Sequence, residues 1–327
     1  MKTLITGANG FVGSAVMHAL LDSGHEVRVL VRPESDRRNL EKLPIEISEG
    51  DLRDTASLKR AVRGCDNLFH VAADYRLWIP DPKVMYEVNI QGTEALMLAA
   101  VDAGIKRVVY TSSVAVLGLN PDSSPATEET PSSLNTMIGH YKRSKFLAEQ
   151  TVQRFIAQHR LPVVIVNPST PIGPRDIKPT PTGRIVLDTI RDRMPAYVDT
   201  GLNVVHVDDV AAGHLLAYEK GVPGQRYILG GENMTLLQIL QSIDEITGKT
   251  GKRTRLPHQL VLPAAWMMEK IAGITGMEPR ATVDGVRMAK KQMYFSSEKA
   301  VRELGYRYRP AKEALENAIT WFEENNY

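Results

Sequence analysis

The first twenty residues of the chain combine a short apolar segment with three closely spaced glycines. Residues 3–5 (Thr-Leu-Ile) predict a buried strand, Gly7, Gly10 and Gly13 follow at intervals of three, and apolar residues then recur at helical spacing. A strand, a glycine turn and a helix bring free backbone N–H groups and a helix N-terminus to one point, which favours a diphosphate. Glycine also permits a positive φ and lets phosphate oxygens approach the backbone.

A second apolar segment supports this interpretation. Residues 27–31 (Val-Arg-Val-Leu-Val) predict a strand that begins one helix length after the glycine turn. In such a strand–helix–strand unit a glycine turn binds a dinucleotide, whereas elsewhere it is an ordinary strand-to-helix turn. We therefore expect the cofactor diphosphate to lie against the residues of this turn, Gly7, Asn9, Gly10, Phe11, Val12 and Gly13.

The composition excludes several classes of protein. A chain of 327 residues, 43% of them apolar and 24% charged, suits a globular protein of one large or two modest domains. A net charge of +2 gives no reason to expect nucleic-acid binding. The single cysteine, Cys65, cannot form an internal disulfide, so a cytoplasmic location is the simplest expectation. Apolar stretches end short of the roughly 20 residues that a transmembrane helix needs, and the histidines show no metal-ligand spacing.

Predicted strands and helices alternate along the first half of the chain. Short apolar strands follow one another after helical segments, at residues 27–31, 45–48, 67–70, 107–111 and 163–166. This alternation predicts an α/β protein, a doubly wound parallel sheet (Rossmann fold) with a smaller, mainly helical C-terminal lobe for the substrate. We expect residues 1–170 to form the dinucleotide-binding domain, with 204–229 returning to it, and residues 171–203 and 230–327 to form the substrate-binding lobe.

Small and polar residues follow the predicted strands, at the edge where doubly wound sheets bind ligands. Arg32 comes directly after the second strand, at the position that faces the adenosine ribose. A guanidinium there can pair with a 2′-phosphate, so the sequence favours NADP(H) over NAD(H), with a solvated surface arginine as the alternative. The other residues that we expect against the cofactor also follow a strand: Val71, Ala72, Ala73, Thr111, Ser112, Asn167, Pro168 and Ser169.

Tyr141 and Lys145 are four residues apart at the start of a predicted helix and hence lie on one face of it. A tyrosine has a pKa of about 10 in isolation, and a neighbouring ammonium lowers that pKa toward working pH. With a nicotinamide at hand, the tyrosine would give or take the proton that accompanies hydride transfer. The same spacing also occurs between solvated residues on a helix surface, so its meaning depends on the surrounding motifs.

The order of these motifs resembles the extended short-chain dehydrogenase/reductases. Residues 6–13 carry Thr-Gly-x-x-Gly-Phe-x-Gly, two serines end the fifth strand, and Tyr-x-x-x-Lys opens the next helix. The resemblance implies Ser113 as the catalytic serine, with Ser112 as the alternative, and Tyr141 as general acid/base. It implies two roles for Lys145, which are to tune the tyrosine and to bind the nicotinamide ribose, together with Tyr141 as a neighbour of the cofactor.

The resemblance also implies roles for three residues outside this group. Asn89 stands within a helix expected over residues 84–103 and supports a proton relay in family members, with a tolerated polar residue as the alternative. Asp51 and Leu52 match a pair that contacts adenine in the extended reductases. A cap for the helix expected at 56–63 is the alternative role of Asp51.

Two groups within the family share further segments with this chain. It is similar to dihydroflavonol 4-reductase-like reductases in its second strand and in residues 295–299, and to bacterial hopanoid-associated sugar epimerases in residues 73–78 and 167–174. The resemblance implies an NAD(P)-dependent oxidoreductase that acts on the carbonyl or secondary alcohol of a small molecule, and it allows a homodimer. An NAD-dependent sugar epimerase or dehydratase is the alternative, and a non-catalytic dinucleotide-binding protein is a minor one.

Overall fold

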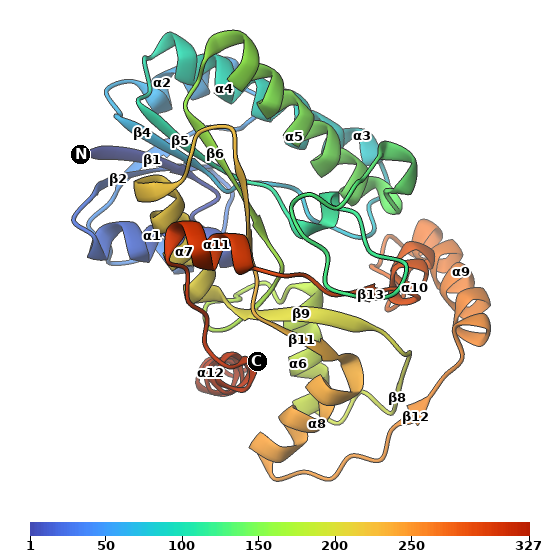
Figure 1. Ribbon diagram of the computed structural model, residues 1–327. Coiled ribbons are helices and arrows are strands. Elements are labelled where there is room, and N and C mark those ends of the chain that lie inside the picture. The colour runs from blue at the N-terminus through green and yellow to red at the C-terminus, as the bar shows by residue number, and fades with distance from the viewer.

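The computed structural model describes residues 1–327 and has a central seven-stranded sheet in which every pairing is parallel (Figure 1). The strand order is β3-β2-β1-β4-β5-β6-β10, with the reversal of winding between β1 and β4. The strands are β1 (Lys2–Thr6), β2 (Glu26–Val31), β3 (Glu46–Glu49), β4 (Asn67–His70), β5 (Arg107–Thr111), β6 (Val163–Pro168) and β10 (Arg226–Leu229). The predicted doubly wound parallel sheet is confirmed.

Helices cover both faces of this sheet (Figure 1). One face packs against α1 (Phe11–Asp22), α7 (Val207–Lys220) and α11 (Glu298–Leu304), and the other against α2 (Thr55–Val62), α4 (Gly92–Asp102) and α5 (Gly139–His159). Successive strand residues enter opposite cores, because side chains alternate along a strand. Leu4 packs on the α2 side and Ile5 on the α1 side, and both are fully buried. Such double burial explains the continuous apolar character of these strands.

The C-terminal lobe is built on a second, smaller sheet. Its central strand is β9 (Gly201–His206), which pairs antiparallel with β11 (Glu232–Thr235) and parallel with β7 (Thr170–Ile172) and β13 (Gln292–Met293). Three helices enclose a separate apolar core on this sheet: α6 (Pro181–Ile190), α8 (Leu236–Thr247) and α12 (Ala311–Glu324).

Two further helices stand at the edge of this lobe (Figure 1). A short parallel pair, β8 (Ala196–Tyr197) with β12 (Thr254–Arg255), precedes them. They are α9 (His258–Thr275) and α10 (Val283–Ala289), and they pack on each other. They lie near the start of α5, on the side of the large sheet where its strands end.

Two segments differ in detail from the sequence-based expectation. Of residues 204–229, which we expected to return to the large domain, α7 packs on α1 and β10 pairs with β6, whereas β9 pairs only with strands of the smaller sheet. β9 has no place beside β6, because β10 occupies that edge. The single helix expected over 84–103 is α3 (Pro82–Tyr86) and α4 joined by a π-helical turn, η2 (Glu87–Gln91). The domain boundaries stay a prediction.

Candidate active site

The turn between β1 and α1 has a shape that suits a diphosphate. Gly7 adopts a φ of +77°, and the Gly10 N–H donates to the Gly7 carbonyl at 2.9 Å. A Cβ on Gly13 would lie 2.0 Å from that carbonyl oxygen, and a Cβ on Gly7 would lie 2.7 Å from the Ala72 nitrogen. No side chain caps the start of α1, so the first N–H groups of the helix stay free for an anion.

The other residues of this turn have different surroundings. The Asn9 amide donates to the Asp36 carbonyl at 3.4 Å, which ties the turn to the loop after β2. Phe11 is buried in the core below α1, and Val12 packs at the margin of that core. The side chains of Phe11 and Val12 therefore support the turn, and only the backbone atoms of these two residues remain for a ligand.

The remaining cofactor residues that we predicted share one edge of the sheet. Each group follows a strand of the parallel sheet: Arg32 after β2, Asp51 and Leu52 after β3, Val71, Ala72 and Ala73 after β4, Thr111 and Ser112 at the end of β5, and Asn167, Pro168 and Ser169 at the end of β6. Because neighbouring parallel strands end at the same edge, the fold brings these groups together.

Three arginines lie near the end of β2, and Arg32 alone has no carboxylate partner. Arg37 pairs with Glu49 at 2.5 Å and Arg38 with Asp36 at 2.7 Å, whereas Arg32 is exposed and forms no ion pair. Its guanidinium is therefore available to an anionic ligand at this edge.

Asp51, at the end of β3, is held by the next turn of the chain. Its carboxylate pairs with Arg53 at 2.9 Å, and this hydrogen bond lowers its pKa, with a smaller contribution from the charge of Arg32. The alternative role that we considered for Asp51, a helix cap, belongs instead to Asp54, whose carboxylate accepts the Ala56 N–H at the start of α2.

Three buried polar atoms at the ends of β5 and β6 have no hydrogen-bond partner in the protein. They are Ser112 Oγ, Asn167 Oδ1 and Ser169 Oγ. An unsatisfied buried polar group costs about 1–3 kcal/mol, so a cluster of them indicates a place that a ligand completes. Asn167 is held in position, since its Nδ2 donates to the Ser113 carbonyl at 3.0 Å and to Glu149 at 3.2 Å. These residues fit a nicotinamide dinucleotide that lies along this edge.

Two hydroxyl groups meet between the end of β5 and the start of α5. Burial raises the pKa of the Tyr141 phenol, against the lowering that we expected from the Lys145 ammonium, and the neighbouring Ser113 hydroxyl acts in the opposite direction. The Ser113 Oγ also accepts the Ala115 N–H at 3.1 Å, at the start of the short helix η3 (Val114–Val116). Ser113, rather than Ser112, is therefore the serine beside the tyrosine.

Lys145 lies one turn further along α5 and is only 3% exposed. Its Nζ donates to the Thr111 carbonyl at 2.8 Å and to the Tyr110 hydroxyl at 3.4 Å, and lies 4.9 Å from the centre of the Tyr110 ring. Burial lowers the pKa of Lys145 to about 8, although the charge of Glu149 opposes this shift. The ammonium is thus fixed on the helix face that carries Tyr141.

Asn89, in the π-helical turn η2, forms three hydrogen bonds through its side chain, and its role in a proton relay stays a prediction. Its Nδ2 donates to the Asp74 carbonyl at 2.8 Å and to Ser144 Oγ at 2.9 Å, and its Oδ1 accepts the Asp74 N–H at 2.7 Å. The side chain joins the loop after β4 to α5, and it does not contact Lys145. Both the oxygen and the nitrogen of the Asn89 amide are thus engaged in hydrogen bonds that hold the loop after β4 in position.

The sequence did not indicate a role for two buried histidines at this edge of the sheet. His70, at the end of β4, bonds to Thr6 at 2.8 Å and Thr93 at 2.9 Å, and burial lowers its pKa to about 3. His214, in α7, bonds to Thr111 at 2.9 Å, and burial lowers its pKa to about 4. Both rings are therefore neutral and fix strand ends. Their partners come from distant parts of the chain, so no local pattern marks them.

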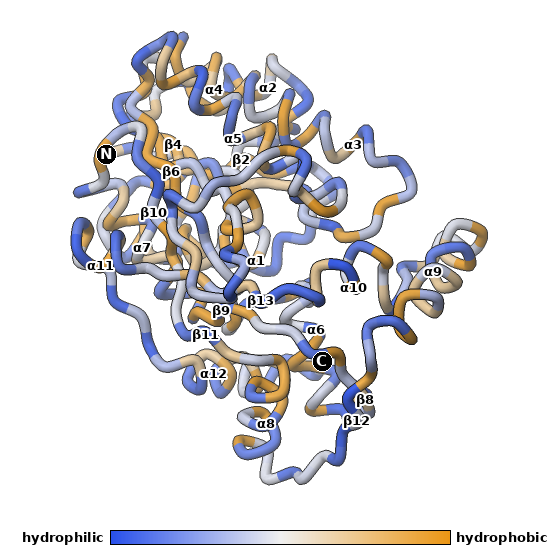
Figure 2. Tube along the Cα trace, turned by 45° about the vertical axis from the view of Figure 1, so that its right-hand side comes forward, coloured by the Kyte–Doolittle hydropathy of each residue, from blue (hydrophilic) through white to orange (hydrophobic).

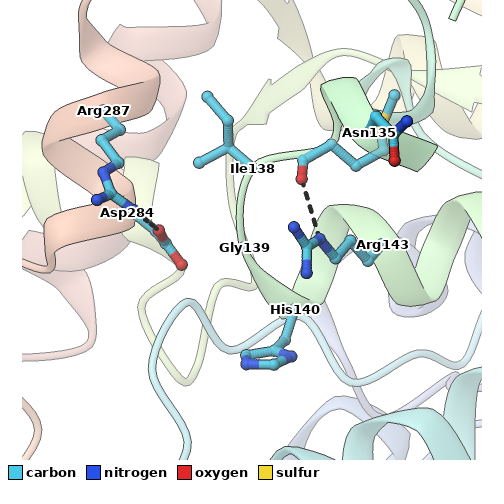
Figure 3. A pocket seen from close by; sticks show the side chains of 8 residues that line it. Asn135, Ile138, Gly139, His140, Arg143, Asp284 and Arg287 are labelled. Atoms are coloured by element: carbon cyan, nitrogen blue, oxygen red, sulfur yellow. Dashed lines mark hydrogen bonds and ion pairs between the residues drawn. The ribbon is translucent and has the colours of Figure 1, made fainter. Parts of the chain in front are cut away.

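Open space adjoins the segments that carry Ser113 and Tyr141. A cavity of about 330 Å³ lies beside the start of α5, where Asp284 and Arg287 of α10 face Gly139 and His140 across it (Figure 3). A second cavity, of about 130 Å³, follows the loop after η3 and reaches Lys142. Burial and the charge of Lys291 lower the pKa of Lys142 to about 8. Both cavities lie between the segment around the start of α5 and α10 with the residues that follow it.

A doubly wound sheet that opens with a glycine turn is the architecture of enzymes that use nicotinamide dinucleotides. A family model described as the NAD dependent epimerase/dehydratase family matches residues 3–230. The chain belongs to this family, as its motifs predicted, and it is an enzyme of the NAD-dependent oxidoreductase, epimerase and dehydratase type.

Known proteins match the chain over nearly its whole length. It is 47% identical to a protein of Synechocystis named "Putative dihydroflavonol 4-reductase", over 99% of this chain and 95% of that one. It is 36% identical to sterol demethylase protein B of Methylococcus capsulatus, over 99% of both. The crystal structure of gox2253 superposes with a TM-score of 0.89 at 53% identity, over 99% of this chain and 98% of that one.

Proposed function

We propose that this enzyme reduces the carbonyl group of a small molecule to a secondary alcohol with NADPH, in the manner of a dihydroflavonol 4-reductase. The observation that carries the proposal is the meeting of Ser113, Tyr141 and Lys145 beside three buried polar atoms that have no protein partner. The name of the 47% identical Synechocystis protein supports reductase chemistry.

In the proposed reaction, bound NADPH supplies the hydride. Ser113 holds the substrate oxygen by a hydrogen bond, and Tyr141 gives its proton to that oxygen, so that the C=O group becomes CH–OH. The Lys145 ammonium stabilises the phenolate that Tyr141 becomes. Its bond to the Thr111 carbonyl keeps this charge on the tyrosine's side of α5. We propose that Asn89 positions the loop after β4 through its two bonds to Asp74, and its part in a proton relay stays a prediction.

The proposed cofactor is NADP(H), with NAD(H) as the alternative. Arg32 supports this choice, because it is the arginine near the end of β2 that forms no ion pair with a carboxylate. The diphosphate would lie on the β1–α1 turn and the nicotinamide near Tyr141 and Asn167. The substrate would then enter between that edge and the lobe of residues 171–203 and 230–327.

Epimerisation is the second candidate function, because the matching family model describes NAD dependent epimerases and dehydratases. The two reactions differ in their cofactor balance. A reductase consumes one NADPH for each product molecule, whereas an epimerase ends each turnover with its cofactor unchanged. Residues 201–205 (Gly-Leu-Asn-Val-Val) replace the Arg-Asp-Tyr/Phe segment of nucleotide-sugar epimerases, which argues against a UDP-sugar substrate.

The experiment is to follow NADPH absorbance with a panel of flavanonols, ketosteroids and aldehydes, for the wild type and Tyr141→Phe. We expect carbonyl-dependent oxidation by the wild type and a loss in kcat of about 10²–10⁴-fold in the variant, which keeps the ring but not the proton. NADPH affinity should be unchanged. The matched control is Tyr218→Phe on α7, whose hydroxyl contacts only Met1 Sδ. Retention of most activity by Tyr141→Phe would contradict the assignment.

Two further proposals concern the cellular location and the oligomeric state of the protein. No helix meets the length and hydropathy needed to cross a membrane. We propose a cytoplasmic enzyme, because Cys65 is free and buried, and burial raises the pKa of its thiol. We also propose a homodimer, which size-exclusion chromatography with light scattering tests directly.

A further inference from the structure

Helix α9 turns its large apolar side chains away from the protein. Of its 18 residues, only the small Ala265 and Ala272 are buried. Seven large apolar side chains of α9 and the turn after it are between 37% and 88% exposed, and we call them the α9 apolar face: Leu260, Trp266, Met267, Met268, Ile271, Ile274 and Met277. Figure 2 shows the hydrophobic segments of α9 at the outer edge of the molecule. An exposed apolar surface of this extent indicates an interaction site.

The spacing of these residues gives the face its direction. Leu260, Met267, Ile271 and Ile274 recur at helical intervals, so at about 100° per residue they fall within about 60° of one another. Ala265 and Ala272 lie on roughly the opposite side of the helix, and α9 packs there against the lobe. The stripe therefore points outward, where it is free to contact another surface.

Exposed basic residues lie on α9 and on the segments that follow α9 and α10. The Lys270 ammonium lies 5.5 Å from the Trp266 ring centre, and Arg280 follows soon after the end of α9. Lys290 and Lys291 come directly after Ala289, whose carbonyl bonds to His258 at the start of α9. None of these four basic residues is in an ion pair, so their charges are free.

The acids of the same region have partners within the protein. Glu269 accepts the Val283 N–H at 2.8 Å, Glu278 pairs with Arg184 at 2.8 Å, and Asp284 lies 3.6 Å from Arg287. Arginines balance Glu278 and Asp284, so Glu269 is the one unpaired acid against four unpaired basic residues, and positive charge predominates near the apolar face although the whole chain has a net charge of only +2.

We propose that the α9 apolar face docks on an anionic lipid bilayer, with α9 lying in the plane of the membrane surface. Tryptophan, isoleucine and methionine side chains enter the boundary between headgroups and acyl chains, and flanking basic residues bind anionic headgroups. A second copy of the chain suits this face less well, because a symmetric contact would bring two rims of unpaired positive charge together.

Docking would place the bilayer next to the candidate active site. α9 packs on α10, and α10 supplies Asp284 and Arg287 to the cavity beside the start of α5 (Figure 3). Tyr141 lies in the first turn of that helix. Membrane binding itself requires no turnover, so its test is separate from that of the proposed reaction.

The test is co-sedimentation of the full chain with vesicles of phosphatidylcholine alone or of an equal mixture with phosphatidylglycerol. We expect binding to the mixed vesicles, with a blue shift of Trp266 fluorescence that Trp266→Phe removes. The double variant Met267→Glu/Ile271→Glu should lose at least about tenfold in binding, since it puts two charges into the apolar face. Lys270→Gln/Arg280→Gln should lose roughly 25-fold, at about fivefold for each basic residue near an anionic surface.

The matched control is Val222→Glu/Val301→Glu, which adds the same charges at two exposed apolar residues elsewhere, 54% and 46% exposed. It should bind vesicles as the wild type does, and all variants should keep wild-type NADPH affinity and thermal unfolding. Wild type that stays in the supernatant, equal binding to both vesicle types, or binding unaffected by Met267→Glu/Ile271→Glu would overturn the proposal. So would a wild-type dimer that this variant converts to monomer, because a second copy would then cover α9.

Discussion

At the scale of single residues, we expect Arg32 to decide which cofactor the enzyme prefers. Its guanidinium has no carboxylate partner, and a 2′-phosphate brings nearly two negative charges to the same edge. Solvent weakens such a pair, so we expect NADP(H) to bind about 10- to 100-fold more tightly than NAD(H). Calorimetric titration of both cofactors should show that Arg32→Ala removes most of this preference and that salt reduces it. Arg38→Ala, which removes an arginine already paired with Asp36, is the matched control. Equal affinities of the wild type for the two cofactors would mean that Arg32 does not contact the 2′-phosphate.

At the same scale, we expect Lys145 to set the pH dependence of the proposed reduction. Its folded-state pKa of about 8 is below the ordinary value, so the ammonium is present below pH 8 and is lost as the pH rises through that value. Since the charge stabilises the Tyr141 phenolate, kcat for reduction should fall above about pH 8. Lys142 has a pKa of about 8 as well, so Lys142→Gln is the control, and it should keep the decline. A profile that stays flat beyond pH 9, or that flattens in Lys142→Gln, would rule Lys145 out as the titrating group.

Residues differ in how much of their role the sequence reveals. The spacing of Gly7, Gly10 and Gly13 predicted the turn, because a strand and a helix flank it within the same twenty residues. The sequence could not show that Ser112, Asn167 and Ser169 each have a buried polar atom without a partner, because this depends on which side chains pack around them in the folded protein. A hydroxyl after a strand is visible in a sequence, but its lack of a partner is a property of the packed structure.

At the scale of elements, the turn η2 explains why Asn89 stands in a helix that it does not favour. The wider π-helical turn accommodates the side chain, which then binds both backbone groups of Asp74 and the Ser144 hydroxyl. The sequence suggested an irregularity here, because Asn and Gly are poor residues within a helix. It did not show the direction of the amide, since Asp74 and Ser144 come from other elements.

The contacts of Asn89 lead to a prediction about this element. Asn89→Ala removes three hydrogen bonds that are at least partly buried, so the free energy of unfolding should fall by about 2–3 kcal/mol. Cofactor affinity should weaken with the loop after β4, while kcat should change by less than about tenfold if the residue positions the loop rather than relays protons. Urea unfolding and single-turnover kinetics separate the two roles. A large loss of kcat with an unchanged free energy of unfolding would instead support a role for Asn89 in a proton relay. Ser144→Ala, which removes one of the three bonds, should show the smaller effect.

At the scale of the whole molecule, the large sheet was predictable and the lobe was only partly so. Most strands of the large sheet have a buried apolar segment and alternate with helices, and the parallel order follows from that alternation, whereas the edge strand β3 (Glu-Ile-Ser-Glu) is largely exposed. β7, β11 and β13 have two to four residues each and pair through β9 with segments far away in the sequence. Strands this short carry no periodic signal, so the sequence indicated a lobe that is mainly helical and gave no sign of its second sheet.

Asp176, in the segment that joins β7 to α6, connects the stability of the whole molecule to pH. Its Oδ2 accepts the Thr180 N–H and the Thr180 hydroxyl, both at 2.8 Å, but its Oδ1 is buried without a partner. Burial raises the pKa of Asp176 to about 6, and the two bonds from Thr180 oppose the shift without cancelling it. The ionised carboxylate is therefore more costly in the folded state than in the unfolded chain.

The sign of this shift predicts a stabilising substitution. Below the pKa that Asp176 has in the unfolded chain, its carboxyl is neutral in both states and does not affect the free energy of unfolding. As the pH rises toward about 6, the unfolded chain ionises first and the free energy of unfolding falls. Above about pH 6 the destabilisation is constant. Asp176→Asn removes this buried charge, so at pH 7.5 the free energy of unfolding should rise by about 1–3 kcal/mol. Any hydrogen bond to Thr180 that the variant loses reduces this gain. Urea unfolding should show this gain shrinking toward zero near pH 4, whereas Asp22→Asn, at an exposed position on α1, should show none at either pH. Lower stability of Asp176→Asn at pH 7.5 would mean that the bonds to Thr180 outweigh the cost of burying the charge.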